Sequence, residues 1–372
     1  MARMRSGRLA AVIGAAVMAV AALGGAGTAG AAPARTTTPA TTTPQDFSAP
    51  GKMTTMRLGP FSLAPTPLGS LPHQNRVIPQ IAQPCTDCFI TGIRPRLVYA
   101  DGSNADMATG VMLHHLVIAD TAKRDLTCAR EDGIGAIGRR IFASGDERTP
   151  FALPAGYGFK VDPGKWIGIV ELMNHSPLPR EVFFEADVWT LPTSTPHMKP
   201  VTPVWLDMAN CLDSEYSVPA GKSERDWTWA STITGKIVTA AGHVHAGGVG
   251  TILSNASTKQ RICSSEAGYG SPDADGYHAD PLANMVTSMS ACSWDKLGTV
   301  KKGEQLKLTS IYDTPAAMSG VMGIMLVAVH ETSDLKSGSV APKAMRATPD
   351  TKVPSGVAHS ESLLPDGGGH GH

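Results

Sequence analysis

Two short motifs in the chain place histidines close enough together to bind a metal ion. The stretch GVMLHHLVIAD carries His114 and His115 side by side, and AAGHVHAGG carries His243 and His245 at a spacing of two. On a β-strand, residues i and i+2 project from the same face about 7 Å apart, which suits chelation of one ion. Adjacent residues point to opposite faces. His114 and His115 can therefore share a metal only if their strand bulges, twists or ends there, and otherwise one faces the core and one faces water.

Two further residues could complete such sites. His175 closes the run KWIGIVELMNHS, where a strand meets a Pro-containing turn and can project a ligand. The run SGVMGIMLVAVHE reads as a strand whose alternation puts Met322 on one face and Met325 on the other, while Met318 precedes the run and is the second choice for a sulfur ligand. A thioether beside two imidazoles favours copper over zinc, because soft sulfur stabilises Cu(I).

The elements that must position these residues are predicted to be β-strands. Short runs rich in Val, Ile, Thr and aromatic residues recur, divided by Gly, Pro, Asn and Asp, as in RLVYADG, REVFFEADVWTL and LKLTSIYD, and helical periodicity is almost absent. A Thr/Pro-rich turn segment near residues 191–200 separates two groups of runs. We therefore predict an all-β fold of two tandem β-sandwich domains, over residues 51–196 and 197–332.

The two ends of the chain have the composition of export and linker segments. Basic MARMRSGR precedes an apolar run and an A-x-A type cleavage site near Ala31 or Ala32, which predicts a signal peptide over residues 1–32. A Thr/Pro-rich linker is predicted over residues 33–50 and a disordered tail over residues 333–372. Because no second apolar run of membrane length follows, we expect a secreted protein with no membrane anchor after cleavage.

The charge composition bears on which classes of partner the chain can bind. The chain has 32 basic and 32 acidic residues and no basic stripe, which argues against nucleic acid as a partner.

The order of the ligand candidates resembles that of the copper type II, ascorbate-dependent monooxygenases, the family of peptidylglycine α-hydroxylating monooxygenase and dopamine β-monooxygenase. In that order, HH is followed by a lone His at a strand end, then by H-x-H, then by a late strand containing Met. The segments PAGYGFKVDPGKWIGIVELMNHS, YSVPAGKSERDW and CFITGIRPRLVYADG also resemble segments of the family near these ligands. The likeness covers about residues 85–330.

The resemblance implies two tandem jelly-roll-like β-sandwiches with one copper ion in each. The first copper, which would pass in an electron, would be held by His114, His115 and His175. The second copper, at which O₂ would attack a substrate C–H bond, would be held by His243, His245 and Met322. Ascorbate or a similar electron donor would reload both ions.

All six cysteines lie within the predicted core, and in an exported protein this predicts structural disulfides. A redox pair or a metal knuckle at Cys85-x-x-Cys88 is the alternative, but no second C-x-x-C completes a zinc site. The resemblance implies a bond between Cys88 and Cys128. Within the second domain we expect Cys263 to pair with Cys292, which leaves Cys85 and Cys211 unassigned.

Three positions depart from the peptide-amidating members of the family. Those members place an Arg two residues before the H-x-H motif, where this chain has Ala241. They place an Asn and a Tyr two and four residues after the ligand Met, where this chain has Ile324 and Leu326. A buried site without these polar anchors does not reward a terminal carboxylate. We therefore expect the substrates to be O₂ and a small, apolar molecule rather than a glycine-extended peptide.

Three other functions fit parts of the pattern. A secreted copper-binding protein without turnover would use the same ligands, and the terminal GGGHGH suits metal capture. A zinc hydrolase would use three histidines, but there is no H-E-x-x-H motif, no carboxylate lies within either histidine pair to act as a base, and Glu171 is weak support. In a plain β-sandwich binding module the histidines would be incidental.

Overall fold

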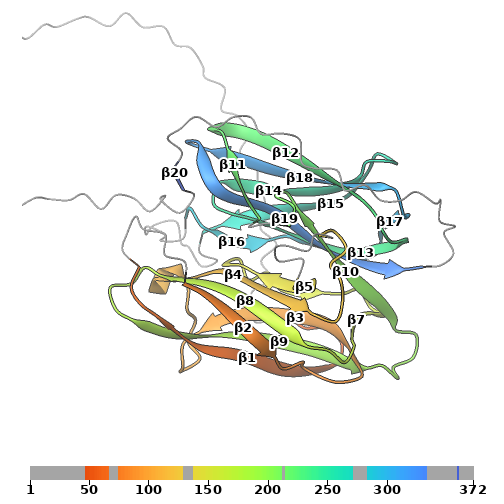
Figure 1. Cartoon of the computed structure of the whole chain (residues 1–372), viewed down its shortest axis with the longest axis horizontal. Helices are drawn as coiled ribbons and strands as arrows, with labels where there is room; N and C mark the ends of the chain where they lie inside the picture. The colour runs from red at the N-terminus through yellow and green to blue at the C-terminus, as the bar shows by residue number, and fades with distance from the viewer. Residues whose placement is uncertain are drawn as a thin grey trace, which may run out of the picture. The chain divides into compact units, whose positions relative to one another are not determined.

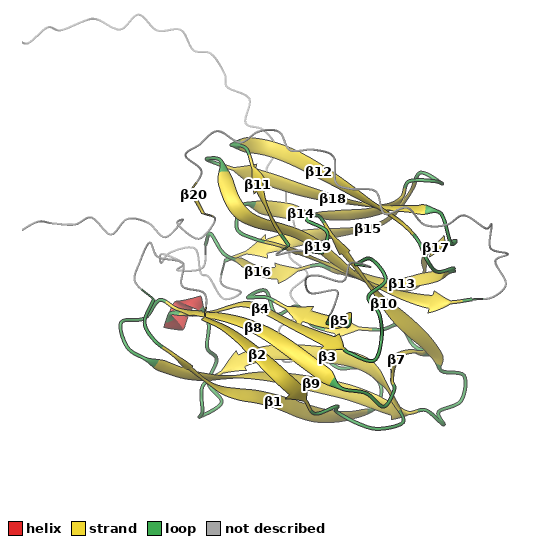
Figure 2. Ribbon diagram, in the orientation of Figure 1, coloured by secondary structure: helices red, strands yellow, loops and turns green. Residues whose placement is uncertain are grey.

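The computed structural model describes residues 47–66, 74–128, 137–211, 214–270 and 283–332, together with the short strand β20 (Ala358–His359). Almost all regular structure there is β-strand, and the exception is one 3-10 turn, η1 (Met107–Thr109) (Figure 2). The predicted all-β fold is confirmed. The predicted signal peptide, most of the linker and most of the tail lie outside the described residues. Within them, no helix has the length and apolar character needed to span a bilayer.

The strands up to residue 192 form two sheets around one apolar core. They are β1 (Lys52–Leu63), β2 (Gln74–Ile81), β3 (Cys88–Val98), β4 (Val111–Asp120), β5 (Arg139–Ser144), β6 (Phe151–Ala152), β7 (Tyr157–Val161), β8 (Trp166–Asn174) and β9 (Arg180–Pro192). One sheet has the order β1-β9-β3-β7 and the other β2-β8-β4-β5. Leu97 and Phe184 of the first sheet and Leu116 and Val170 of the second belong to one buried cluster, so the two sheets pack face to face.

The strands from residue 199 onward repeat this plan (Figure 1). They are β10 (Lys199–Asp207), β11 (Glu215–Val218), β12 (Gly221–Ala230), β13 (Gly235–Val244), β14 (Gly248–Asn255), β15 (Gln260–Tyr269), β16 (Val286–Met289), β17 (Ala291–Val300), β18 (Gln305–Thr314) and β19 (Met318–Glu331). One sheet has the order β10-β19-β13-β17 and the other β12-β18-β14-β15-β16. Leu206 and Met325 of the first sheet pack against Trp227 and Leu308 of the second.

One strand pair connects the two groups. β7 runs parallel to β10, with Tyr157 opposite Lys199 and Phe159 opposite Val201, so a single sheet path continues from the first group into the second. Every other pairing among the described strands stays within one group. The predicted domain boundary falls in the turn between β9 and β10, and the division into two domains stays a prediction.

Three disulfides pair all six cysteines, as Cys85–Cys88, Cys128–Cys211 and Cys263–Cys292. The expected disulfides and the Cys263–Cys292 bond are confirmed, but the pairing of Cys88 with Cys128 is wrong. Cys128 follows β4 and lies with its Cα 5.3 Å from that of Cys211, which follows β10. This separation lies within the range that a disulfide requires. The bond therefore joins the two groups of strands, and Cys88 closes a local loop with Cys85.

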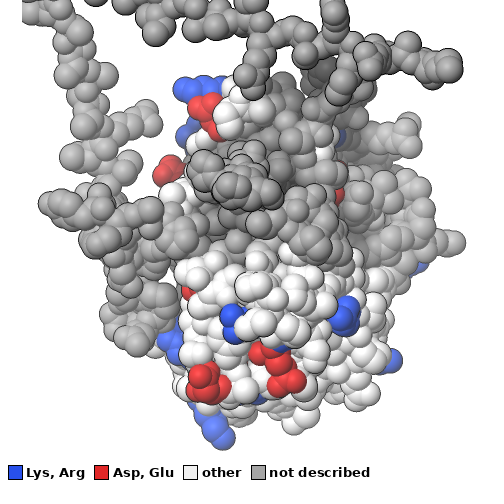
Figure 3. Space-filling model, turned by 90° about the vertical axis from the view of Figure 1, so that its left-hand side faces the viewer, with Lys and Arg blue, Asp and Glu red and all other residues white. Residues whose placement is uncertain are grey.

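Charges on the described surface are mixed in sign. On the face of the β1-β9-β3 sheet away from the core, Arg57 and Arg96 contact Glu185 while Arg94 and Arg96 contact Asp187. In Figure 3, the coloured basic and acidic side chains are likewise interspersed rather than gathered into a patch of one sign.

Candidate metal centre

A β-bulge in β4 turns two neighbouring histidines toward the same side. Leu113 lies opposite Leu172 of β8 and His115 lies opposite Glu171, so His114 is the extra residue between two consecutive pairs. Such an extra residue removes the alternation that sends adjacent side chains to opposite faces. The two imidazole rings accordingly lie with their centroids 4.0 Å apart. The bulge is the irregularity that the sequence required for both rings to share a metal.

The end of β13 presents the second histidine pair. His243 lies opposite Ile324 of β19, and His245 follows directly after the strand ends. The backbone N–H of His245 donates to the Tyr312 hydroxyl over 2.9 Å, and that hydroxyl donates to the carbonyl oxygen of Met322 over 2.6 Å. Buried Tyr312 therefore fixes the H-x-H segment against β19.

The two pairs, more than a hundred residues apart in sequence, meet in one cluster. His115 Nε2 lies 3.0 Å from His245 Nε2. The ring centroids of His114 and His245 are 5.0 Å apart, and those of His115 and His243 are 5.3 Å apart. One ring nitrogen from each of His114, His115 and His245 lies within 4.8 Å of the other two. Two nitrogens that bind the same ion at about 2.0–2.1 Å lie about 3–4 Å apart, so the cluster has the spacing of a metal site.

Hydrogen bonds to Nδ1 orient three of the rings. His115 Nδ1 lies 3.3 Å from a carboxylate oxygen of Glu171, and His243 Nδ1 lies 3.2 Å from one of Glu147. His245 Nδ1 donates to the carbonyl oxygen of Gly320 over 2.7 Å. When Nδ1 carries the proton, Nε2 carries the lone pair. Nε2 of His243 is buried without a hydrogen-bond partner among the described residues, as expected of an atom that binds a metal.

Burial keeps the imidazoles of His115 and His245 neutral. It lowers the pKa of His115 to about 3 and the pKa of His245 well below its usual value, and the neighbouring histidines lower both further. For Glu147, burial opposes ionisation, but the adjacent His243 holds the pKa of this carboxyl below its usual range. Neutral imidazoles are the form that binds metals, so His115 and His245 are ready to bind an ion at neutral pH.

A cavity of about 470 Å³ opens beside the cluster. Its lining includes the rings of His115 and His243 and a largely apolar wall made of Phe142, Trp205, Ala241, Met322, Ile324 and Leu326. Met322 is 5% exposed and packs with Trp205 and Ile324, whereas Met325 is fully buried in the separate core between the sheets. The two methionines therefore face opposite sides of β19, as strand alternation predicts.

Two groups of known proteins resemble this chain in sequence. Residues 192–332 match the family model SURNod19, described as stress up-regulated Nod 19. The chain is 30% identical over 243 residues to the "probable copper-dependent oxygenase clz3" of Cochliobolus lunatus, a match that covers 59% of this chain and 69% of that protein. The chain belongs to the family of this probable oxygenase.

A second relative has the same sequence identity to this chain. The "probable copper-dependent oxygenase M1" of Phoma sp. is 30% identical over 247 residues, which cover 62% of this chain but only 58% of that protein. Among solved structures, PNGase F, a glycosylasparaginase from Flavobacterium meningosepticum, aligns over 76% of this chain and 97% of that chain. Its TM-score of 0.38 and sequence identity of 10% are too low to bear on fold or function.

The candidate metal-binding side chains of this chain fit copper. Four imidazoles meet at the cluster, and a thioether lines the cavity next to it. Imidazole alone suits zinc, copper, iron and nickel, whereas a thioether adds a preference for Cu(I).

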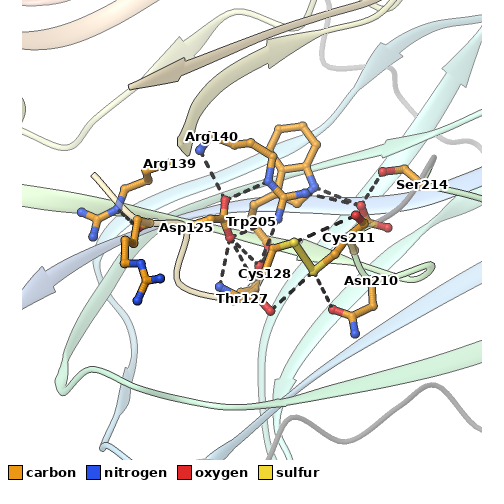
Figure 4. Close-up of polar contacts among 11 residues, drawn as sticks. Asp125, Thr127, Cys128, Arg139, Arg140, Trp205, Asn210, Cys211 and Ser214 are labelled. Carbon is orange, nitrogen blue, oxygen red and sulfur yellow. Dashed lines mark hydrogen bonds and ion pairs between the residues drawn. A yellow bond between two sulfur atoms is a disulfide. The ribbon is translucent and has the colours of Figure 1, made fainter. Parts of the chain in front are cut away.

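The basic residue among those described around the cavity is Arg140, and its charge is already neutralised. Its guanidinium donates to both carboxylate oxygens of Asp125 over 2.8 and 3.1 Å (Figure 4). The same guanidinium lies 3.6 Å from Asp207. It also lies 4.8 Å from the ring centroid of Trp205. Burial opposes the ionisation of Asp125, but Arg140 holds the pKa of that carboxyl below its usual range. Two carboxylates around one guanidinium leave no positive charge for an anionic ligand.

The predicted site residues are brought together only in part. His114, His115, His243 and His245 form the cluster and Met322 lines the adjoining cavity, but His175 is not in the cluster. Its backbone N–H donates to the carbonyl oxygen of Gly110, near the start of β4, so about four strand positions, or about 13 Å, separate it from His115.

Sequence reasoning did not place two carboxylates against the histidine rings. No acidic residue lies within either histidine pair, yet the structure places Glu171 beside His114 and His115, and Glu147 beside His243. Glu171 comes from the neighbouring strand, and Glu147 comes from the turn after β5. Their positions depend on strand pairing, so spacing along the chain carried no signal for them.

Proposed function

We propose that this chain is a secreted, copper-dependent monooxygenase related in mechanism to the ascorbate-dependent enzymes that its ligand order resembles. The observation that carries the proposal is the meeting of four histidines beside a largely apolar cavity that His115, His243 and Met322 line. The names of its relatives as probable copper-dependent oxygenases support the choice of copper. Three disulfides support an oxidising, extracellular location.

In the proposed reaction, one atom of O₂ enters a substrate C–H bond and the other leaves as water. Two electrons and two protons come from ascorbate or a similar donor. Bound copper would supply the one-electron chemistry that lets O₂ react. The chain's own residues orient the ligand rings through their Nδ1 atoms, and the apolar wall holds the substrate and excludes bulk water.

The proposed ligands follow the order of the motifs. His114 and His115 would hold a first copper, and His243, His245 and Met322 a second. His175 lies about four strand positions from His115 and would not complete the first site. Metal analysis of the purified protein should then find two coppers per chain. One copper per chain would mean that the clustered rings share a single ion, and zinc in place of copper would overturn the proposal.

The substrate is proposed to be small, uncharged and largely apolar. Ala241, Ile324 and Leu326 line the cavity at positions where the peptide-amidating enzymes carry polar anchors. The neutralised Arg140 offers an anion no compensation for its lost hydration.

Oxygen consumption tests the activity. With copper, ascorbate and a panel of apolar molecules, O₂ uptake should depend on one of the added molecules and yield a hydroxylated product. His243→Ala should lose one copper and all oxygenation, and His115→Ala should lose the other copper and the supply of the second electron. Tightly bound copper without substrate-dependent uptake would instead identify a copper-binding protein without turnover.

A further inference from the structure

Two carboxylates contact Nδ1 atoms of the clustered imidazole rings. Glu171 lies directly opposite His115 in the β4–β8 pairing, and one of its oxygens is 3.3 Å from His115 Nδ1 and 3.2 Å from His114 Nδ1. Glu147 lies 3.2 Å from His243 Nδ1. Each histidine pair therefore has its own carboxylate.

The turn that carries Glu147 is built to hold it there. The carboxylate accepts from the backbone N–H of Gly145 over 3.2 Å. A Cβ at position 145 would clash with a Glu147 oxygen in its present position and lie 2.9 Å from the His243 ring, so glycine at this position permits the close approach. Between them, Asp146 accepts from Arg148 over 3.0 Å and from the backbone N–H of Leu113 over 3.4 Å, which fixes the turn against β4.

We propose that Glu171 and Glu147 are positioning residues for the metal centre, one for each histidine pair. This inference rests on the proposed function. Each carboxylate accepts the Nδ1 proton of a ligand ring, which selects the tautomer with the lone pair on Nε2 and holds the ring plane toward the cluster. A carboxylate behind an imidazole also raises its basicity and thereby strengthens its bond to a metal. Glu147 also links the two groups of strands, because it comes from the first group and orients the His243 ring of the second.

Two isosteric substitutions test this role. In Glu171→Gln and Glu147→Gln the amide is a weaker acceptor than the carboxylate and can present its NH₂ group to the ring. Loss of such outer partners typically weakens metal affinity about 10–100-fold. We expect each variant to weaken one class of bound copper by that factor, in titrations of the full-length protein against a competing chelator. The electron paramagnetic resonance spectrum of the remaining Cu(II) should also change, because altered ring orientation changes its nitrogen couplings.

The controls separate positioning from general damage. Glu181→Gln makes the same chemical change at an exposed position of β9 and should leave both copper affinities and the spectrum unchanged. Glu171→Asp retains the charge and should keep more affinity than Glu171→Gln. Thermal unfolding of the metal-free variants shows whether they fold. If Glu171→Gln does not fold, Glu171→Asp and Glu147→Gln test the inference. If Glu147→Gln does not fold, the two Glu171 variants test it.

The outcomes distinguish the inference from the function on which it rests. Wild-type affinity and spectrum in both Gln variants would overturn the positioning role while leaving the copper enzyme intact. A wild-type chain that binds no copper would overturn the proposed function and this inference with it.

Discussion

At the residue scale, the protonation and donor atoms of a few side chains decide what the cluster can bind. The rings of His115 and His245 are neutral in the folded chain because burial disfavours their charged forms. Met322 contributes the soft donor of the cavity wall. Both properties can be tested separately from catalysis.

The metal-free protein should lose stability in mild acid. The folded-state pKa of His115 is about 3, below the unfolded value, so the unfolded chain binds more protons between these values. The free energy of unfolding should therefore fall as pH drops from about 6.5 toward about 3, by up to about 1.4 kcal/mol per pH unit for each such histidine. Urea unfolding across this range measures the slope. His115→Gln should flatten it, and an equal slope in that variant would contradict the assignment.

Met322 should be the sulfur ligand. Met322→Leu conserves volume and should cost less than about 1.5 kcal/mol of stability, yet remove the sulfur scatterer from the X-ray absorption spectrum of the Cu(I) protein and most turnover. Met325→Leu is the matched control, because Met325 lies in the core away from the cavity. A sulfur signal that survives in Met322→Leu would point to another methionine.

At the element scale, irregularities in strand pairing build the site. The sequence could predict β-strands, the shared face of Met322, Ile324 and Leu326, and the need for a bulge at the HH motif, because these follow from local periodicity. It could not predict that Glu171 lies opposite His115, or that Glu147 reaches His243. Those contacts depend on pairings between segments that are distant in the chain.

The bulge should be dispensable for folding but not for metal binding. His114 is the one extra residue between two consecutive β4–β8 pairs, so deleting it leaves every other pair in register. We expect the deletion variant to fold, with a stability change within about 3 kcal/mol, and to lose copper. Deleting buried Leu116 instead slips the register and exchanges core and cavity faces, so it should abolish folding. Circular dichroism and metal analysis compare the two, and an unfolded His114 deletion would show that the bulge is structural.

The cavity wall between β13 and β19 should reject anions. Naphthalene derivatives that differ only in a methanol, carboxylate or aminomethyl group serve as probes for calorimetric binding. The uncharged alcohol should bind at least about 10-fold more tightly than the carboxylate, because Arg140 is already paired. Ala241→Phe should fill the cavity and remove this binding while copper is retained. Preferred binding of the carboxylate would mean that Arg140 is available to ligands.

At the scale of the whole molecule, two connections join the groups of strands that contribute the two histidine pairs. One is the parallel pairing of β7 with β10, and the other is the Cys128–Cys211 disulfide, which lies beside the Arg140–Asp125 ion pair (Figure 4). The histidine cluster takes residues from both groups of strands, so these two connections hold the metal centre together as well as stabilising the fold.

Removing the Cys128–Cys211 bond should destabilise the protein strongly. The bond closes a segment of 83 residues, so the double variant Cys128→Ala, Cys211→Ala should lose about 2–5 kcal/mol in the free energy of unfolding. The double variant Cys85→Ala, Cys88→Ala opens a loop of three residues and should lose less. Denaturant unfolding measures both losses of stability. Equal losses would show that constraint of the unfolded chain does not explain how the Cys128–Cys211 bond stabilises the protein.

The same disulfide sets an order of events while the chain is being made. The thiol of Cys128 emerges 83 residues before that of Cys211, and during that interval the available partners are Cys85 and Cys88. Prompt closure of the Cys85–Cys88 bond removes both competing thiols, so Cys128 stays unpaired until Cys211 is available. The Cys85–Cys88 bond, which closes the smallest loop, would thereby protect the Cys128–Cys211 bond, which closes the longest. A chain that lacks only Cys85 or only Cys88 would be expected to trap Cys128 in a bond with the remaining cysteine of that pair.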